Sequence, residues 1–366
     1  MIIKGKYNSA QVFVDSLDHG SYEQIQKLCD QDFLRDSKIV IMPDVHVGKG
    51  STIGTTMTIH DKVVPNLVGV DIGCGLIVLK LKERAIDYKK LDEVIKRQIP
   101  SGFSIRNTRH NNTTKLQIDN LIAKDHVDLD RGYLSLGTLG GGNHFIEINE
   151  NTNHEKYCVI HSGSRHIGLQ IAQHYQQLAI QSMKAKDINI SDDLAYLEGK
   201  LMDDYLHDMK IIQEFAWYNR QSMADEIIKG MNFKVLDSFQ TIHNYIDTKE
   251  MILRKGAVSS QKDEIFILPL NMRDGSVILK GKGNPDWNYS APHGAGRIMS
   301  RTQARKRIRL SDYQESMKGI YSSMISHHTL DEAPMAYKDG QKILNLITPT
   351  ADILEHLKVT YNFKAK

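Results

Sequence analysis

The residues with the clearest chemical potential lie in the segment Ser290-Ala-Pro-His-Gly-Ala-Gly-Arg297, which places the imidazole of His293 between a proline and two glycines. Glycine lets a backbone take unusual conformations and approach a ligand closely. Backbone N–H groups in such a loop, together with the planar donors of Arg297, could hold phosphate oxygens. The segment therefore predicts a loop in which His293 attacks a phosphorus atom. The alternative is a tight glycine turn that contains an incidental histidine.

A second group of side chains has the chemistry of a metal centre. One carboxylate, one thiol and three imidazoles occur in glycine- or asparagine-bearing segments: Asp71, Cys74, His144, His161 and His243. Such a set can hold two divalent ions with the soft thiolate bridging them, and an ion pair of this kind can clamp a phosphate. Manganese or zinc suits these ligands better than magnesium, which prefers oxygen atoms. Taken one at a time, each histidine could instead be an ordinary buried residue.

Composition limits the class of protein. The chain has 366 residues, of which 40% are hydrophobic and 25% charged, and its formal net charge is +3. These values are ordinary for a soluble enzyme, so any nucleic-acid surface must be a local patch. No apolar run approaches the ~18 residues that cross a bilayer, and the first residues lack a signal-peptide core. We therefore expect a cytoplasmic protein with no membrane association, and its three cysteines do not suggest a disulfide framework.

The segments that must position these side chains alternate between short strands and polar loops. Strands are predicted at residues 39–42, 76–81, 145–148, 157–160, 265–268 and 276–279. Apolar residues recur at helical spacing between about 166 and 232, which predicts an inserted long helical arm. A closing helix and tail are predicted at 338–358. No repeat or linker divides the chain, so we expect one compact α+β domain over 1–366, with mixed or antiparallel sheets around the metal centre.

Seven segments in this order resemble the RtcB family of RNA-splicing ligases. They are Pro43-Asp-Val-His-Val-Gly-Lys-Gly50, Gly69-Val-Asp-Ile-Gly-Cys-Gly75, Gly137-Thr-Leu-Gly-Gly-Gly-Asn-His-Phe-Ile-Glu147, His161-Ser-Gly-Ser-Arg165, His243-Asn244, Arg254-Lys-Gly-Ala257 and Pro292-His-Gly-Ala-Gly-Arg-Ile-Met-Ser-Arg301. They extend over most of the chain, and seven ordered matches make the resemblance specific.

The resemblance implies an enzyme that joins an RNA 3′-phosphate or 2′,3′-cyclic phosphate end to a 5′-hydroxyl end, using GTP and two Mn²⁺ ions. A histidine becomes guanylylated, passes GMP to the RNA 3′-phosphate to give an RNA(3′)pp(5′)G intermediate, and the 5′-hydroxyl then displaces GMP. The reaction would serve RNA repair or tRNA splicing. An archease-like protein is a candidate activator, and we expect a monomer.

Site residues follow from the same resemblance. His293 would be the guanylylated histidine, and Asp44 would accept the hydrogen bond that fixes its tautomer. Residues implied to contact the nucleotide are Asn143, Glu147, Ala295 and Tyr337, and residues implied to hold phosphates of the RNA are Arg165, Lys255, Arg297 and Arg301. The five metal ligands of the family match the set chosen above from residue type.

The chain departs from the family pattern in two places. Most members carry a Pro-Gly-Ser-Met-Gly turn where this chain has Pro269-Leu-Asn-Met-Arg-Asp-Gly275, in which Asn271 could still donate to a nucleotide. The usual C-terminal sequence Arg-Pro-Leu-Gly-Val-Ile-Lys-Gly is replaced, with Lys364 in the place of its lysine. The chain is also short for the family, which suggests a compact, divergent branch.

Basic residues follow the His293 loop closely and suggest an RNA surface: Arg297, Arg301, Arg305, Lys306, Arg307 and Arg309. A solvated helix face would look the same. Two other functions use the same residues. One is a metal-dependent phosphatase or 2′,3′-cyclic phosphodiesterase that never ligates, and the other is a non-catalytic protein that binds RNA ends.

Overall fold

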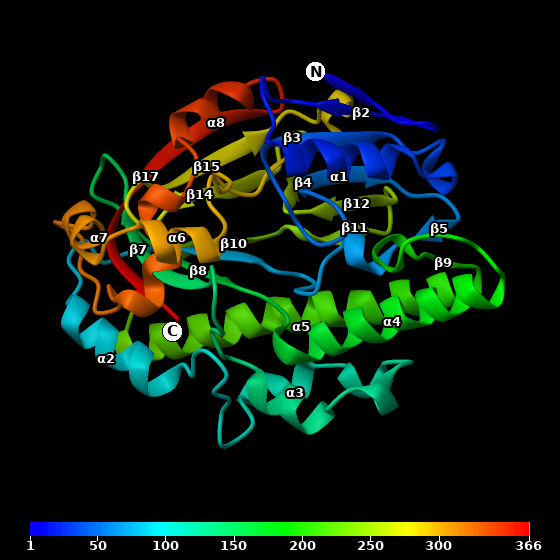
Figure 1. The fold of residues 1–366 in the computed structure, drawn as a ribbon. Helices are drawn as coiled ribbons and strands as arrows, with labels where there is room; N and C mark the ends of the chain where they lie inside the picture. The colour runs from blue at the N-terminus through cyan, green and yellow to red at the C-terminus, as the bar shows by residue number, and fades with distance from the viewer. Residues whose placement is uncertain (366) are drawn as a thin grey trace.

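Two β-sheets and a long helical hairpin form the framework of this protein, whose computed structural model describes residues 1–365 (Figure 1). The first sheet has the strand order β1-β2-β3-β4-β12-β11, and only its β2–β3 pair is parallel among residues 1–365. Its strands are β1 (Ile2–Lys4), β2 (Ser9–Val12), β3 (Ile39–His46), β4 (Ile53–Thr58), β11 (Asn244–Asp247) and β12 (Ile252–Lys255).

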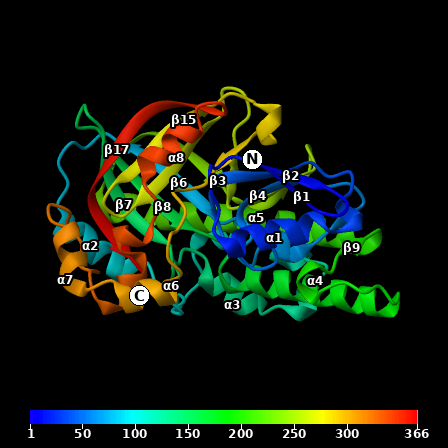
Figure 2. The ribbon, with the colours of Figure 1, turned by 45° about the horizontal axis from the view of Figure 1, so that its top comes forward.

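The second sheet is antiparallel throughout and has the order β10-β6-β8-β7-β17-β15-β14. It is strongly curled, because its two edge strands, β10 and β14, contact each other. Its strands are β6 (Gly75–Leu81), β7 (Phe145–Glu150), β8 (Lys156–Ser162), β10 (Val235–Ile242), β14 (Ile265–Asn271), β15 (Gly275–Gly281) and β17 (Ala351–Lys364). The long β17 is the red strand that arches over one side of the molecule in Figures 1 and 2.

Short ladders and helices complete the chain. Two small ladders pair β5 (Lys62–Val63) with β9 (Leu197–Glu198) and β13 (Ala257–Ser259) with β16 (Ser290–Pro292). The α-helices are α1 (His19–Cys29), α2 (Tyr88–Gln98), α3 (Leu129–Ser135), α4 (Arg165–Ala185), α5 (Lys200–Met231), α6 (Arg301–Arg307), α7 (Leu310–Ser316) and α8 (Gly340–Leu346).

The predicted helical insertion is confirmed as the pair α4 and α5, which run side by side below the sheets in Figure 1. The pair buries apolar residues at helical spacing, including Ile171 and Tyr175 on α4 and Met209 and Ile212 on α5. Helix α5 ends where Asn232 takes the left-handed conformation that stops a helix. Its C-terminal half packs on β6 and β8, so the hairpin supports the second sheet.

The predicted strands are all present, and so is the closing helix predicted within 338–358, but the tail predicted after that helix is a long strand. Only α8 is helical there, and β17 begins at Ala351. Its residues Leu357, Val359, Tyr361 and Phe363 are buried, and the residues between them are more exposed until Asn362, which is also buried. A period of two is typical of a strand. The alternation was legible in the sequence, but the preceding helical turns obscured where it began.

Separate apolar clusters hold the layers together. One lies between the first sheet, α1 and the hairpin, and a second joins the seven-stranded sheet to α2 and α5. A third cluster fills the inside of the curled sheet with residues such as Leu76, Phe145 and Ile267. None of the helices within residues 1–365 is long and apolar enough to span a bilayer. The mixed-sheet α+β prediction is confirmed, with one compact domain.

Candidate active site and metal centre

Strand register brings four of the predicted metal ligands to one end of the seven-stranded sheet. Gly75, at the start of β6, pairs with Ile242 at the end of β10 and with Ser162 at the end of β8. Phe145, at the start of β7, pairs with His161. Cys74, His144 and His243 are the chain neighbours of these paired residues, so antiparallel pairing alone places the thiol and the imidazoles at one edge.

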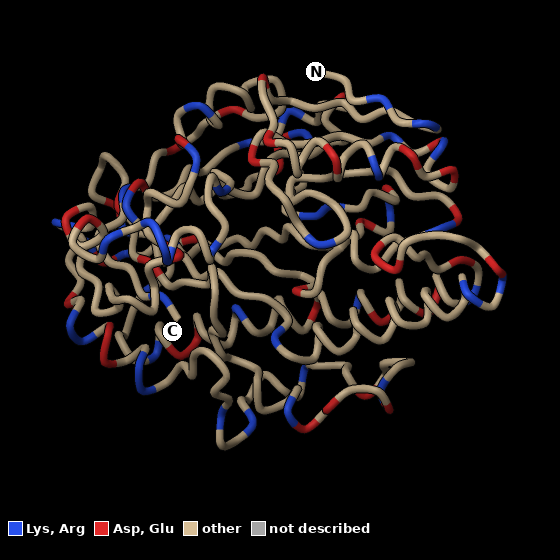
Figure 3. Tube along the Cα trace, viewed as in Figure 1, with Lys and Arg blue, Asp and Glu red and all other residues tan. Residues whose placement is uncertain are grey.

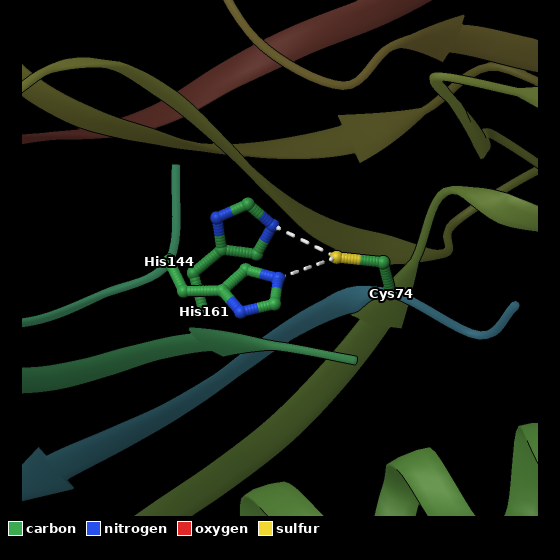
Figure 4. A group of neighbouring side chains, drawn as sticks. All are labelled: Cys74, His144 and His161. Carbon is green, nitrogen blue, oxygen red and sulfur yellow. Dashed lines mark hydrogen bonds between the residues drawn. The ribbon is translucent and has the colours of Figure 1, made fainter. Parts of the chain in front are cut away.

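The side chains meet at short distances. Sγ of Cys74 lies 3.5 Å from Nε2 of His144 and 3.3 Å from Nε2 of His161 (Figure 4). Nε2 of His161 lies 3.3 Å from Nε2 of His243, and Oδ2 of Asp71 lies 3.0 Å from Nε2 of His144. The ligand atoms of Cys74, His144 and His161 all fall within 4.8 Å of one another, as in a site that could hold a metal ion.

The outward-facing nitrogens of two rings fix which atoms face the centre. Nδ1 of His144 lies 2.8 Å from the carbonyl of Leu139, and Nδ1 of His161 lies 3.2 Å from the carbonyl of Asn143. Carbonyls only accept, so each neutral ring carries its hydrogen on Nδ1 and turns a lone pair inward on Nε2. Lone pairs of nitrogen, sulfur and carboxylate oxygen then face one another, an arrangement that a divalent cation satisfies.

Burial sets the protonation of these groups. Burial lowers the pKa of His161 and of His243 well below the ordinary value, and neighbouring histidines lower both further, which keeps the rings neutral. Burial and the Asp71 carboxylate raise the pKa of the Cys74 thiol, so its thiolate needs a nearby cation. Burial alone would raise the pKa of Asp71, but the neighbouring groups His144 and Arg165 outweigh it, so the pKa falls and the carboxyl group is ionised. The donor set therefore fits a borderline divalent ion.

Helix α5 holds the loops of this centre from behind. The side-chain oxygen of the buried Asn219 accepts from the backbone N–H groups of Gly137 and Thr138, and its amide donates to the carbonyls of Thr138 and Gly163. The guanidinium of the buried Arg220 donates to the carbonyls of Gly73 and Ser162. Two adjacent residues thus hydrogen-bond to all the loops that carry Cys74, His144 and His161. Neither was predicted from the sequence.

His293 stands opposite this centre, on the loop after β16. Its Nδ1 lies 2.7 Å from Oδ2 of Asp44, a fully buried residue of β3. The loop packs directly on β3, because Gly296 has φ +77° and a Cβ there would collide with the backbone of Asp44. Asp44 can only accept from a neutral ring, so Nδ1 carries the hydrogen and Nε2 keeps its lone pair. The ring is 16% exposed, which leaves it accessible from the cavity.

The junction between the two sheets brings His293 to the metal ligands. His243 lies between β10 of one sheet and β11 of the other, and its carbonyl accepts from the N–H of Ala257 at the start of β13. Because Ala257 pairs with Pro292 on β16, the His293 loop is held beside His243. The two ring centroids are 4.7 Å apart. A candidate nucleophile and a candidate metal centre therefore share one site.

A cavity of about 1000 Å³ opens over these residues. It is large enough for a nucleotide together with part of a second substrate. Thirteen of the predicted site residues line it: Asp71, Cys74, Asn143, Glu147, His161, His243, Asn271, His293, Ala295, Arg297, Arg301, Tyr337 and Lys364. Asp44 and His144 lie behind His293 and Cys74 respectively. Arg165 and Lys255 are not among the lining residues that the structure describes.

One end of the cavity is built by two cross-strand rows of β7 and β17. Phe145 pairs with Lys364 and Glu147 pairs with Asn362, so all four side chains face the inside of the curled sheet. The Asn362 amide donates to Glu147 over 2.7 Å. Burial raises the pKa of Glu147 to about 7, against the lowering effect of Asn362 and the charge of Lys364. Glu147 is thus a carboxyl acceptor whose charge changes near neutral pH.

Glu332, which was not predicted from the sequence, is the carboxylate that several side chains of the cavity wall contact. Its side chain, 3% exposed, accepts from Nζ of Lys364 over 2.9 Å and from the hydroxyl of Tyr337 over 2.6 Å. It also accepts from the Arg297 guanidinium over 3.2 Å. Burial alone would raise the pKa of Glu332, but Lys364, Arg301 and Arg297 outweigh it and the pKa falls. Its position five residues before Tyr337 was the available signal.

The four basic residues predicted to hold phosphates take different places. The Arg297 guanidinium lies over the Tyr337 ring and is bonded to Glu332, so it stiffens the wall. Arg301 begins α6 and is half exposed at the rim, and the trace of α6 carries several basic positions in Figure 3. Arg165 donates to Thr138 and to the carbonyl of Gly102. The Lys255 ammonium donates to backbone carbonyls of residues 49 and 66, and its burial lowers the pKa to about 7.

Two further cavity residues were missed in sequence. Nδ1 of His46 lies 2.9 Å from the carbonyl of Asp44, and burial lowers the pKa of His46. Lys338 donates to the carbonyls of Pro43 and Val45. His46 lies within the Pro43–Gly50 segment and Lys338 follows Tyr337, which was the signal that could have found them. Together they clamp the stretch of β3 that carries Asp44.

Comparison with known proteins finds consistent similarity. Residues 24–365 match the model of a family described as tRNA-splicing ligase RtcB. The RNA-splicing ligase RtcB of Escherichia coli strain K12 is 33% identical over 361 residues, covering 87% of this chain and 88% of that protein. The tRNA-splicing ligase RtcB of Aeropyrum pernix is 28% identical over 400 residues, covering 83% of this chain and 82% of that protein.

Proposed function

Because this chain belongs to the RtcB family of RNA-splicing ligases, we propose that it joins RNA ends in a GTP- and Mn²⁺-dependent reaction. One end carries a 3′-phosphate, or a 2′,3′-cyclic phosphate that is first hydrolysed, and the other carries a 5′-hydroxyl. The products would be repaired RNA or spliced tRNA. The relatives are named as RNA- or tRNA-splicing ligases, which supports a ligase, and the chemistry of the site supports the finer statement.

The observation that carries the proposal is the hydrogen bond between Nδ1 of His293 and Asp44, 2.7 Å long, beside the cluster of metal-type ligands. Asp44 holds the hydrogen on Nδ1, which leaves Nε2 as a nucleophile whose positive charge Asp44 stabilises once Nε2 has reacted. A largely buried imidazole that opens onto a cavity of nucleotide size is suited to attack phosphorus.

In the proposed reaction, Nε2 of His293 attacks the α-phosphorus of GTP, a P–N bond forms, and the bond to the β-phosphate oxygen breaks to release pyrophosphate. An oxygen of the RNA 3′-phosphate then attacks the same phosphorus, which breaks the P–N bond and gives a 3′-pyrophosphate-linked guanosine. Finally, the 5′-hydroxyl loses its proton and attacks the RNA 3′-phosphorus, and GMP leaves. His293 is regenerated as the neutral imidazole.

Asp71, Cys74, His144, His161 and His243 are the residues that would hold two Mn²⁺ ions. When bound, the ions would neutralise phosphate charge close to His293. The inward lone pairs described above support this assignment, because neutral imidazoles and a thiolate are ligands for manganese or zinc. Asn219 and Arg220 would keep the ligand loops at the right spacing.

Guanine is proposed to bind at the end of the cavity formed by β7 and β17. The ionised Glu147 would accept from the guanine N–H groups, Lys364 would lie near the base, and Tyr337 would stack near it. Asn143, Asn271 and Ala295 would complete the nucleotide contacts. Arg301, at the rim, is the best placed of the basic residues to meet RNA phosphate, while Arg297, Arg165 and Lys255 are engaged inside the protein.

The test is incubation of the protein with Mn²⁺ and α-labelled GTP. A stable protein-bound label that is acid-labile and alkali-stable is expected of a phosphoramidate. His293→Ala should abolish the label, whereas His356→Ala, which changes an exposed histidine on β17, should leave it unchanged.

Other outcomes identify other functions. A metal-loaded protein that takes no label would contradict the ligase proposal. If such a protein still opens a 2′,3′-cyclic phosphate, it is a phosphodiesterase or phosphatase. If it does neither but binds RNA ends, it is a non-catalytic binding protein.

A further inference from the structure

Phe103 is displayed to solvent to an unusual degree. Phe103 is 97% exposed. The next most exposed large hydrophobic residue within 1–365 is Ile2, which is 61% exposed and lies next to the N-terminus. An aromatic ring in water gives up the burial that normally stabilises a protein. Phe103 therefore contributes little to folding, and its exposure needs another explanation.

The loop that carries Phe103 is nevertheless held firmly. The N–H of Gly102 donates to the carbonyl of Gly140 over 2.8 Å, and the N–H of Ser104 donates to the carbonyl of Ser101. Two arginine side chains donate to backbone carbonyls of the loop. Arg165 donates to the carbonyl of Gly102 over 3.4 Å, and Arg131 donates to the carbonyl of Phe103 over 3.3 Å. The backbone is thus fixed while the ring faces outward.

The loop is connected to the active site through its hydrogen bond to Gly140. Gly140, its hydrogen-bond partner, is four residues from His144, so at most about 14 Å of extended chain separates it from that candidate ligand. The Gly140 backbone packs against the Arg165 guanidinium, and a Cβ at Gly142 would lie 2.8 Å from Nη1 of Arg301. An RNA end in the cavity would need only a few nucleotides to pass from Arg301 to Phe103.

Basic side chains near the ring are mostly paired with acids. The segment between α2 and α3 lies at the bottom of Figure 1, and Figure 3 shows basic positions along it. The Arg109 side chain is 53% exposed and its guanidinium lies over the Tyr133 ring. Arg131 donates to the carbonyl of Phe103 itself. Arg106 and Arg109 are each paired with an acid, Glu226 and Asp130 respectively, so the positive charge here is moderate and the ring supplies the distinctive contact.

We propose that Phe103 is a stacking platform for one unpaired base of the RNA, a few nucleotides from the end that reacts at His293. This inference rests on the proposed RNA ligase function. Aromatic stacking accepts any base, because every base has a π face. It therefore suits an enzyme that holds RNA ends by backbone and stacking contacts.

The test pairs protein variants with RNA that lacks single bases. A short single-stranded RNA with a 3′-phosphate is prepared with one abasic site at each position in turn, and its Kd is measured at one salt concentration. In the wild-type protein an abasic site at one or two positions should weaken binding about tenfold. Phe103→Ala should weaken binding of the intact RNA by a similar factor and lose all sensitivity at those positions.

Three controls keep the test specific. Phe103→Tyr keeps an aromatic ring and should keep both the wild-type affinity and the wild-type positional pattern. Leu236→Ala, which changes a 60% exposed residue of β10, should also leave both unchanged. His293 should take up GMP equally well in Phe103→Ala, which separates this proposal from the ligase proposal. If Phe103→Ala binds intact RNA normally, or keeps the wild-type abasic pattern, Phe103 is not a stacking platform.

Discussion

A single hydrogen bond decides which nitrogen of His293 can react. Asp44 is fully buried and approaches Nδ1 to 2.7 Å, so the lone pair that remains is on Nε2. The same effect operates beside Cys74. Backbone carbonyls accept from Nδ1 of His144 and of His161, so each ring presents its Nε2 lone pair to the centre. Chemistry at this site therefore depends on the partners behind the reactive atoms.

Asp44→Asn should impair guanylylation severely. An asparagine amide can donate to Nδ1, which would move the ring hydrogen to Nε2 and remove the nucleophilic lone pair. The expected loss in the rate of GMP uptake is about 10²- to 10⁴-fold, the range in which orienting carboxylates act. Initial rates with labelled GTP measure it, and an unchanged urea midpoint would show that the fold is intact. A rate within a factor of about three of wild type would remove Asp44 from the mechanism.

Glu147 should make GTP binding pH-dependent. Its pKa is raised to about 7, mainly by burial, and only the ionised carboxylate can accept from two N–H groups of guanine. Affinity should therefore fall as the pH drops through about 7, by roughly tenfold for each further unit. Calorimetric titration measures this dependence.

Glu147→Gln provides the matched control for that titration. It should bind GTP more weakly but with a flat profile across the same range, because the group that gains the proton is gone. The pKa of His46, His161 and His243 is lowered by burial, so those rings stay neutral in this window. If the slope persists in the glutamine variant, another group controls the pH dependence.

The elements act by bringing chain ends together. Three strands of the curled sheet, β6, β7 and β8, begin or end at the metal-type ligands, and β10 ends one residue before His243. Behind them, α5 offers Asn219 and Arg220 on its inner side, where they bond to the loops between strands. The sheet sets the positions of the loops, and the helix keeps their backbones in place.

Asn219→Ala should loosen the metal centre as a unit. It leaves the N–H groups of Gly137 and Thr138 and the carbonyl of Gly163 buried without their partner. We expect the free energy of unfolding to fall by about 2–4 kcal/mol, together with weaker Mn²⁺ binding. Urea denaturation and metal titration measure the two effects.

Gln221→Ala is the control on the same helix, since it removes only a contact with Asp225 that is less deeply buried. It should change stability by less than about 0.5 kcal/mol and leave metal binding unchanged. Equal effects of the two substitutions would show that Asn219 has no special role in the loops.

Sequence and structure agree best where a local pattern carries the information. The glycine-bearing motifs located His293, Cys74 and His144, and the strand and hairpin segments were legible from apolar periodicity. The tail predicted after the closing helix is instead strand β17, because pairing with β7 and β15, which are distant along the chain, stabilises it. Glu332, Asn219 and Arg220 were not predicted, since each has partners that are distant along the chain, such as Lys364 for Glu332 and Gly163 for Asn219.

The whole molecule closes its site from both sheets and from its own end. β3 of the first sheet supplies Asp44, β7 and β8 of the second supply Glu147 and His161, and β17 carries Lys364 to Glu332. The cavity wall is therefore completed only when the last strand has paired. Folding and nucleotide binding should be coupled at this point.

Glu332→Gln should expose that coupling. It removes the negative charge that faces Lys364 and Arg297, both largely buried. We expect the free energy of unfolding to fall by about 3–5 kcal/mol, as when one partner of a buried pair is lost, and GTP binding to weaken. Glu315→Gln, in an exposed pair with Lys318, should cost less than about 1 kcal/mol. Equal stability of the two variants would contradict the role of Glu332.

The attachment site of GMP shows which residue is the nucleophile. The metal-loaded protein is incubated with GTP, digested under alkaline conditions and mapped by tandem mass spectrometry. We expect one GMP adduct, on the peptide that contains Ser290–Arg297, with the fragment ions assigning it to His293. An adduct on any other residue, or a metal-loaded protein with no adduct, would contradict it.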